Sequence, residues 1–218
     1  IRNCLVGSEM CIRDRVIRGG TIVNAAEISQ CDIGINGGRI VALGENLGPG
    51  VKEIDATGKL VMPGGIDSHC HIDQRSSGGG RNSETFESGT RSAACGGTTT
   101  IICFAAQEKG ELLTPVVEEY HEKAKRSCVD YSFHLIISDP SDQVMNEEVP
   151  KLIESGHRSL KLFMTYPRNR LNDAEILKVL EVAKLNQALV CVHAENHDAI
   201  MYMTCLLYTS PSPRDNSG

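Results

Sequence analysis

The sequence has no tryptophan, and aromatic residues make up only 4% of its 218 positions. So few rings disfavour a stacking platform for bases or sugars. Lysine and arginine form no cluster and the net charge is −6, which argues against nucleic acid because such binding needs a basic face. No apolar run approaches the ~20 residues that span a bilayer. We therefore expect neither a nucleic-acid nor a membrane partner.

Cys-x-x-Cys pairs are also absent among the nine cysteines. Six cysteines in the body of the chain sit singly, most of them in apolar or small-residue runs: Cys31, Cys70, Cys95, Cys103, Cys128 and Cys191. A zinc finger or a dithiol redox site is therefore not expected. Free buried thiols are typical of a reducing compartment, so we predict a cytoplasmic protein.

The two ends of the chain differ from the rest. Leu5–Asp14 can be written as a DNA strand whose reverse complement encodes, in one frame, Cys205–Arg214 residue for residue. Two unrelated natural segments would almost never be complementary in this way, so both ends resemble a translated sequencing-library adapter. Charged residues interrupt any apolar stretch at the front, so a signal peptide is not expected. We expect residues 1–15 and 205–218 to be non-native.

Residues 16–62 contain short extended runs, which we interpret as part of a small β-sandwich domain. Ile33–Ile35 and Arg39–Leu43 are two such runs. Asn36-Gly37-Gly38 between them predicts a tight hairpin, because Asn and Gly tolerate positive φ. The pattern changes at Pro63-Gly64-Gly65.

Strands and helices alternate over residues 63–204. The expected strands are Ile66–Ile72, Thr98–Phe104, Tyr131–Ile137, Leu160–Met164 and Leu189–His193. Asn172–Asn186 is the clearest helix, because Asn172 and Glu175 have capping-box spacing. Such units predict a parallel sheet, either an open doubly wound sheet or half of an eight-fold barrel. No GxGxxG or GxxxxGK motif follows the first strand, so a nucleotide-binding sheet has no direct support.

Two histidines, His69 and His71, fall on the first expected strand. Period two puts them on one face alongside Asp67, and two imidazoles a strand step apart can bind one metal ion. The alternative is a pair of polar strand-end residues that merely bond backbone carbonyls. For this pattern on a buried strand just after Pro-Gly-Gly, we favour the metal site.

Lys161 and His193 lie in the fourth and fifth strands. Burying a charged lysine is unfavourable, and a neutral amine can react with carbon dioxide to give a carbamate that bridges two metals. Taken alone, Lys161 is better explained as a lysine that reaches solvent or meets a carboxylate, and His193 as a structural histidine. Polar groups ending strands one, four and five would, however, meet at the C-terminal mouth of a barrel. The combination favours the barrel.

Four blocks of the chain resemble the cyclic amidohydrolases, and dihydropyrimidinase and D-hydantoinase in particular. They are Pro63–Asp73, Ala93–Thr100, Lys161–Tyr166 and Val192–Asn196. The resemblance covers the whole expected native body. It implies an α/β fold, the N-terminal half of a (β/α)₈ TIM-type barrel, preceded by part of a small β-sandwich. It also implies two divalent metal ions, expected to be Zn²⁺, and a homo-tetrameric parent enzyme.

The resemblance further assigns roles to single residues. His69 and His71 would hold one ion, N6-carboxylated Lys161 would bridge the two, and His193 would bind the second. Tyr166 would donate a hydrogen bond to the developing oxyanion; the alternative for Tyr166 is an ordinary strand-end aromatic. A bridging hydroxide would open a small cyclic amide, a dihydropyrimidine or a hydantoin, to an N-carbamoyl amino acid.

The family's further metal histidine and catalytic aspartate lie beyond this chain, so we expect the chain alone to be inactive. The strand ending near His193 would be an uncovered edge. The loop Asp73–Asn82 lies where such enzymes vary to select ring substituents. Alternatives within the superfamily are allantoinase and dihydroorotase. Alternatives from other classes are a non-catalytic dihydropyrimidinase-related scaffold and an open-sheet binding module without a metal.

Overall fold

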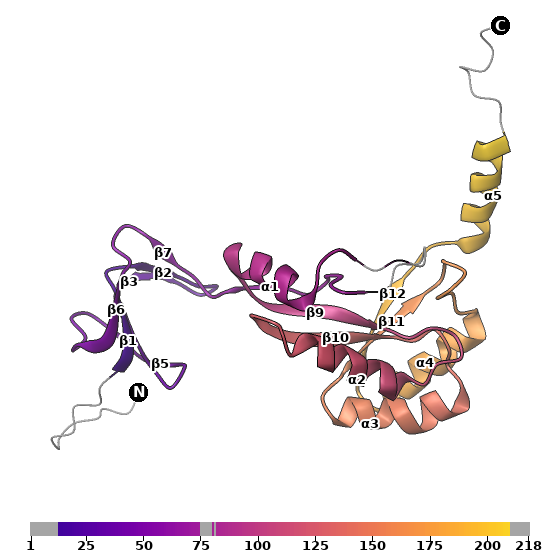
Figure 1. Ribbon diagram of the computed structural model, residues 1–218, viewed down its shortest axis with the longest axis horizontal. Coiled ribbons are helices and arrows are strands. Elements are labelled where there is room, and N and C mark those ends of the chain that lie inside the picture. Colours follow the sequence, from indigo (N-terminus) through magenta and orange to yellow (C-terminus); the bar gives the residue numbers. More distant parts are fainter. Residues whose placement is uncertain (1–12, 75–79, 81, 210–218) are drawn as a thin grey trace, which may run out of the picture. The chain divides into compact units, whose positions relative to one another are not determined.

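The computed structural model describes residues 13–74, 80 and 82–209 (Figure 1). The chain divides into two compact units, with the boundary between Gly64 and Gly65. Within the described residues, no helix is both long and apolar enough to cross a bilayer. Most of each expected foreign tail lies outside the described residues, and the assignment of these tails stays a prediction.

The first unit contains two sheets, with strand orders β5-β4-β1-β6 and β3-β2-β7. Its strands are β1 (Arg13–Arg18), β2 (Thr21–Val23), β3 (Ile28–Gln30), β4 (Asp32–Asn36), β5 (Arg39–Gly44), β6 (Gly50–Asp55) and β7 (Leu60–Val61). The pair β4–β5 is antiparallel. Gly37 and Gly38 between them have φ values of 55° and 73°, so the predicted hairpin is confirmed.

The second unit contains a parallel sheet of five strands in the order β8-β9-β10-β11-β12. Its strands are β8 (Gly65–Asp67), β9 (Thr98–Ala106), β10 (Asp130–Ile136), β11 (Ser159–Phe163) and β12 (Leu189–His193). Its helices are α1 (Phe86–Cys95), α2 (Leu113–Ala124), the π-helical turn Val144–Glu148, α3 (Val149–Glu154), α4 (Asp173–Leu185) and α5 (His197–Thr209).

Strand order in this sheet follows chain order, with helices between successive strands (Figure 1). A doubly wound sheet would reverse its order at a switch point, and the five strands have no such reversal. The arrangement is that of half of a (β/α)₈ barrel, as predicted. The strand β12 lies at one edge of the sheet.

Alternation along the central strands separates two faces of the sheet. One set of strand residues packs with the helices in an apolar core and includes Ile101, Cys103, Ala105, Phe133, Leu135, Leu160 and Leu162. The alternate positions carry Phe104, His134 and Lys161, which are also buried but lie outside that cluster. Because side chains alternate with period two, these three residues share the opposite face of the sheet.

The first strand of this sheet is shorter than predicted. We expected a strand over Ile66–Ile72, but β8 ends at Asp67. The Asp67 carboxylate accepts a hydrogen bond from the backbone N–H of His69 at 3.0 Å, a local bond that competes with strand pairing. His69 and His71 therefore follow the strand, and strand period does not explain their placement.

The predicted capping box of α4 is confirmed. The Asn172 side chain accepts from Glu175 N at 2.9 Å, and Glu175 Oε2 accepts from Asn172 N at 2.8 Å. The helix α2 begins at Leu113, and Pro115 takes its third position.

Two imidazoles meet outside the candidate site. Nε2 of His121, on α2, lies 3.2 Å from Nε2 of His157. Burial is the main cause that lowers the pKa of His157 below its ordinary value of 6.5, and the nearby His121 adds to it. One neutral ring can donate and the other accept, whereas two protonated rings have no acceptor.

We expect the free energy of unfolding to fall as the pH drops below about 6.5. The unfolded chain takes up the His157 proton at its ordinary pKa and the folded chain resists it. This contribution is therefore present above 6.5 and is lost as the pH falls through the lowered folded-state value. Urea unfolding over a pH series would measure it. In His157→Gln, which keeps an N–H but cannot titrate, the pH dependence should weaken; an unchanged slope would contradict the assignment.

Candidate metal centre

Lys161 lies in the middle of β11, between Ile136 of β10 and Cys191 of β12. Its side chain is only 6% exposed. Nζ lies 5.0 Å from the centroid of the Phe163 ring and 5.9 Å from that of Phe104, and it forms no hydrogen bond or ion pair with a described residue. Ring faces attract a cation, but they do not replace the hydration that a buried ammonium loses.

His69 and His71 lie together against Phe104. Their ring centroids are 5.4 Å apart, and each is 4.7 Å from the centroid of Phe104. Nδ1 of His71 is 2.6 Å from Oε1 of Gln74. Because an amide oxygen only accepts, Nδ1 carries the proton and Nε2 keeps the lone pair that a metal needs.

The pKa of His69 is lowered. Partial burial is the largest cause, followed by the positive charges of His71, Lys161 and His134. The neutral imidazole is the form that binds metal. Because the charge of Lys161 contributes to the lowered pKa of His69, the lysine and the histidine interact electrostatically.

His193 is the last residue of β12. Its ring centroid lies 5.5 Å from that of Phe163 and 5.1 Å from that of Tyr166. Nε2 of His193 hydrogen-bonds to Oε2 of Glu195, so a neighbouring carboxylate orients the ring. Among the ring contacts of the described residues, none joins His193 to the histidine pair at Phe104.

Tyr166 has an unusual backbone, with φ of 68°. A bulky residue rarely adopts this left-handed conformation, and such strain is common at functional sites. The Tyr166 carbonyl accepts hydrogen bonds from Asn169 N at 2.9 Å and Arg170 N at 2.8 Å. These bonds hold the turn after β11.

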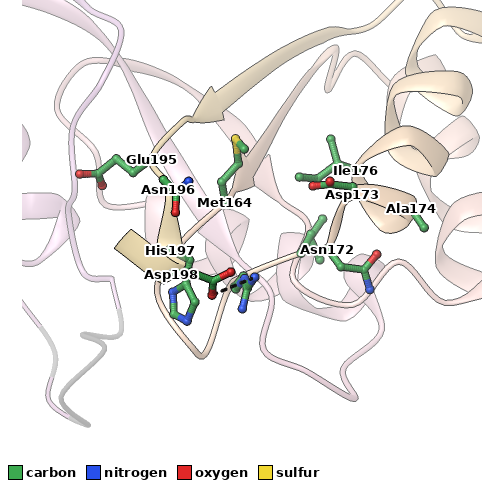
Figure 2. A pocket seen from close by; sticks show the side chains of 11 residues that line it. Met164, Asn172, Asp173, Ala174, Ile176, Glu195, Asn196, His197 and Asp198 are labelled. Carbon is green, nitrogen blue, oxygen red and sulfur yellow. Dashed lines mark ion pairs between the residues drawn. The ribbon is translucent and has the colours of Figure 1, made fainter. Parts of the chain in front are cut away.

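Two cavities lie near these residues. One, of about 570 Å³, is lined by His71, Gln74, Phe163 and Tyr166 among others. The other, of about 590 Å³, lies where α4 and α5 begin and is crossed by an ion pair between Arg170 and Asp198, 3.9 Å apart (Figure 2). None of the five predicted site residues lines this second cavity. The first is therefore the candidate substrate cavity.

The loop Asp73–Asn82 was expected to select ring substituents. Its residues 75–79 and 81 lie outside the described residues. Both described ends of the loop contact His71, because Gln74 bonds its ring and Asn82 Nδ2 donates to its carbonyl at 2.6 Å.

His134 belongs to the site although the sequence analysis missed it. It is 7% exposed; Nε2 lies 2.8 Å from the carbonyl oxygen of Ser68, and Nδ1 lies 2.6 Å from Ser159 Oγ. The carbonyl can only accept, so Nε2 donates and Nδ1 accepts from the hydroxyl. His134 thus ties β10 to the backbone just before His69. A polar residue in an apolar strand, the signal that drew attention to Lys161, was present here too.

The predicted residues form two groups with Lys161 between them. The histidine pair lies beside Phe104, and His193 with Tyr166 lies beside Phe163. Within the described part of the chain, no three His, Cys, Asp or Glu side chains converge on one metal position. An unmodified lysine is not one of these ligand types. A carbamate on Lys161 would, however, add oxygen ligands between the two groups.

The family comparison fits this geometry. The model of the amidohydrolase family matches residues 60–208, more than half of the chain. The chain belongs to the amidohydrolase family. This amidohydrolase is 43% identical over 192 residues to a D-hydantoinase of Ralstonia pickettii and 47% identical over 194 residues to one of Geobacillus stearothermophilus. These matches cover 87% of the chain and 42% and 41% of the two relatives.

Solved structures give the same relationship. The amidohydrolase chain superimposes on dihydropyrimidinase from Brevibacillus agri with a TM-score of 0.84 and 41% identity. The match covers 89% of this chain and 43% of that one. The chain thus spans about two fifths of the length of the relatives it matches.

We expect His134→Ala to lower the free energy of unfolding by about 2 kcal/mol, because it removes both hydrogen bonds of a buried ring. It should also weaken binding of Co²⁺, used as a spectroscopic probe, because the backbone before His69 loses its anchor. Urea unfolding and absorption titration measure the two effects.

The matched control is Ser159→Ala, which removes the bond to Nδ1 of His134 and keeps the bond from Nε2 to Ser68. It should lose stability but retain most of the Co²⁺ affinity. Equal loss of Co²⁺ affinity in both variants would contradict a specific role for the Ser68 bond.

Proposed function

We propose that this chain belongs to an enzyme that hydrolyses small cyclic amides, dihydropyrimidines or hydantoins, to N-carbamoyl amino acids. The observation that carries the proposal is Lys161, a residue only 6% exposed. Its amine lies between the two groups of predicted site residues and forms no hydrogen bond or ion pair with a described residue. The similarity to D-hydantoinases supports the reaction class.

We propose that the site takes two divalent metal ions, Zn²⁺ by preference. His69 and His71 would hold one ion, His193 the other, and carboxylated Lys161 both. The Nε2 of His71 keeps a lone pair for a metal, because Nδ1 is bonded to Gln74. The lowered pKa of His69 favours the neutral form that binds metal. Bound there, the ions would polarise the ring carbonyl and lower the pKa of water to near neutrality.

Lys161 would act through its carbamate. The ammonium first loses one proton; the neutral amine then attacks carbon dioxide, a C–N bond forms, and a second proton leaves. A cation is thus replaced by an anion with two oxygen ligands. The resulting negative charge would offset part of the charge of two dications.

Tyr166 would stabilise the transition state. Its hydroxyl would donate a hydrogen bond to the carbonyl oxygen of the substrate as negative charge develops there. The strained turn at Tyr166 and its place in the wall of the 570 Å³ cavity support this role. Hydrolysis is complete when water has added to the carbonyl carbon, the ring C–N bond has broken and the ring nitrogen has taken up a proton.

We further propose a cytoplasmic enzyme that assembles as a homo-tetramer and has no nucleic-acid or membrane partner. The six cysteines of the expected native body are thiols that form no disulfide, which fits a reducing compartment.

Carboxylation can be tested on the chain itself. With ¹³C-labelled bicarbonate, we expect one carbamate resonance in the NMR spectrum, strengthened by Zn²⁺, because the buried amine is the reactive one. Lys161→Arg should remove it, whereas Lys151→Arg, at an exposed lysine, should leave it unchanged. A resonance that persists in Lys161→Arg would rule out the assigned bridging residue.

Activity can be tested in a chimaera that joins residues 16–204 to the remaining part of the Geobacillus stearothermophilus D-hydantoinase. We expect metal-dependent hydrolysis of hydantoin. Tyr166→Phe should lower kcat about 10²-fold, the effect of removing one oxyanion donor, with the bound metal unchanged. Tyr202→Phe, at a residue 66% exposed, is the control. Turnover that survives metal removal, or full activity in Tyr166→Phe, would refute the proposed mechanism.

A further inference from the structure

Two cysteines far apart in the sequence lie in contact beside the candidate metal centre. Sγ of Cys70 is 3.4 Å from Sγ of Cys103, 33 residues later in the chain. Cys103 lies in β9 and is fully buried, whereas Cys70 follows β8 and is partly exposed. Cys70 N also donates to the Ile102 carbonyl at 3.3 Å, so the backbone holds the two sulfurs together.

We propose that Cys70 and Cys103 form an oxidation site that closes to a disulfide with a peroxide as oxidant, and that closure weakens metal binding by His69 and His71. The second half of this proposal rests on the proposed function, and the first half does not. The absence of Cys-x-x-Cys spacing hid the pair, because these cysteines are adjacent only in space.

The reaction balances with hydrogen peroxide. The thiol sulfur of Cys70, the more accessible of the two, attacks one peroxide oxygen; the O–O bond breaks and gives a sulfenic acid and water. The sulfur of Cys103 then attacks the sulfenic sulfur, the S–S bond forms, and a second water leaves. Two thiols lose two electrons and two protons, and the peroxide is reduced to two waters.

Closure must shift the segment that contains Cys70. A disulfide bond is about 2.05 Å long, so the two sulfurs must approach each other from 3.4 Å. Cys103 is locked in a paired strand within the apolar core, whereas Cys70 lies outside regular structure. The movement therefore falls on the stretch between His69 and His71 and changes how their imidazoles face Lys161.

The other body cysteines serve as internal controls. Cys31 lies in the other compact unit, and Cys95 and Cys128 are exposed. A reagent that reacted by exposure alone would modify Cys95 and Cys128 first. Selective pairing of a buried sulfur with a partly exposed one would reflect their contact.

The site can be tested on the full chain carrying Cys95→Ser, treated with equimolar hydrogen peroxide, alkylated and digested with trypsin without reduction. Mass spectrometry should find residues 60–75 linked to residues 92–109 as the dominant cross-link. Cys70→Ser should abolish this cross-link, and Cys128→Ser should not. In urea, where the chain is unfolded, the cysteines should pair at random. Statistical pairing in native buffer, or no link between these peptides, would overturn the proposal.

A second readout tests the effect on metal. Peroxide treatment should weaken Co²⁺ binding about tenfold, as loss of support around a metal ligand does; a dithiol reductant should restore it, and Cys103→Ser should not respond. A cross-link with unchanged Co²⁺ affinity would overturn the regulatory half alone. If even the reduced chain does not bind Co²⁺, that result counts against the proposed function. It also overturns the effect of oxidation on metal binding. The cross-link result is independent of it.

Discussion

The candidate site depends on one unfavourable burial, that of the Lys161 amine in a central strand. Two aromatic rings lie beside this amine, with the centroid of Phe163 at 5.0 Å and that of Phe104 at 5.9 Å from Nζ. The same rings support the predicted ligands, because Phe104 contacts the histidine pair and Phe163 contacts His193. A pair of apolar rings therefore lies between the polar groups of the site and beside the Lys161 amine, and carboxylation of the lysine stays a proposal.

Much of the fold could be read from the sequence, because it rests on short-range rules. Strand–helix alternation predicted the parallel sheet, and the Asn172–Glu175 spacing predicted the start of α4. The strand Ile66–Ile72 was wrong beyond Asp67, since a single side-chain bond to His69 N ends it. Hydrophobic alternation cannot reveal a local bond of that kind. The strand β3 has no apolar run, so hydrophobic patterning does not predict it.

The site was only partly predictable. Lys161 stood out as a charge among apolar residues. His134 is likewise a polar residue in an apolar strand, but it was not predicted as a site residue. The contact of Phe104 with the histidine pair and the Cys70–Cys103 contact depend on which strand neighbours which and on register between segments some 30 residues apart. One sequence does not contain that information in a local form. The metal roles of the predicted residues stay predictions.

The loop Asp73–Asn82 links two properties that are usually treated as separate. Gln74 sets which nitrogen of His71 is free, and Asn82 holds the His71 carbonyl. If this loop also recognises the ring substituents, a mutation that broadens substrate range acts on a proposed metal ligand, His71, at the same time. The amide groups at the two ends of the loop would then limit how far specificity can evolve before the centre no longer retains its ions.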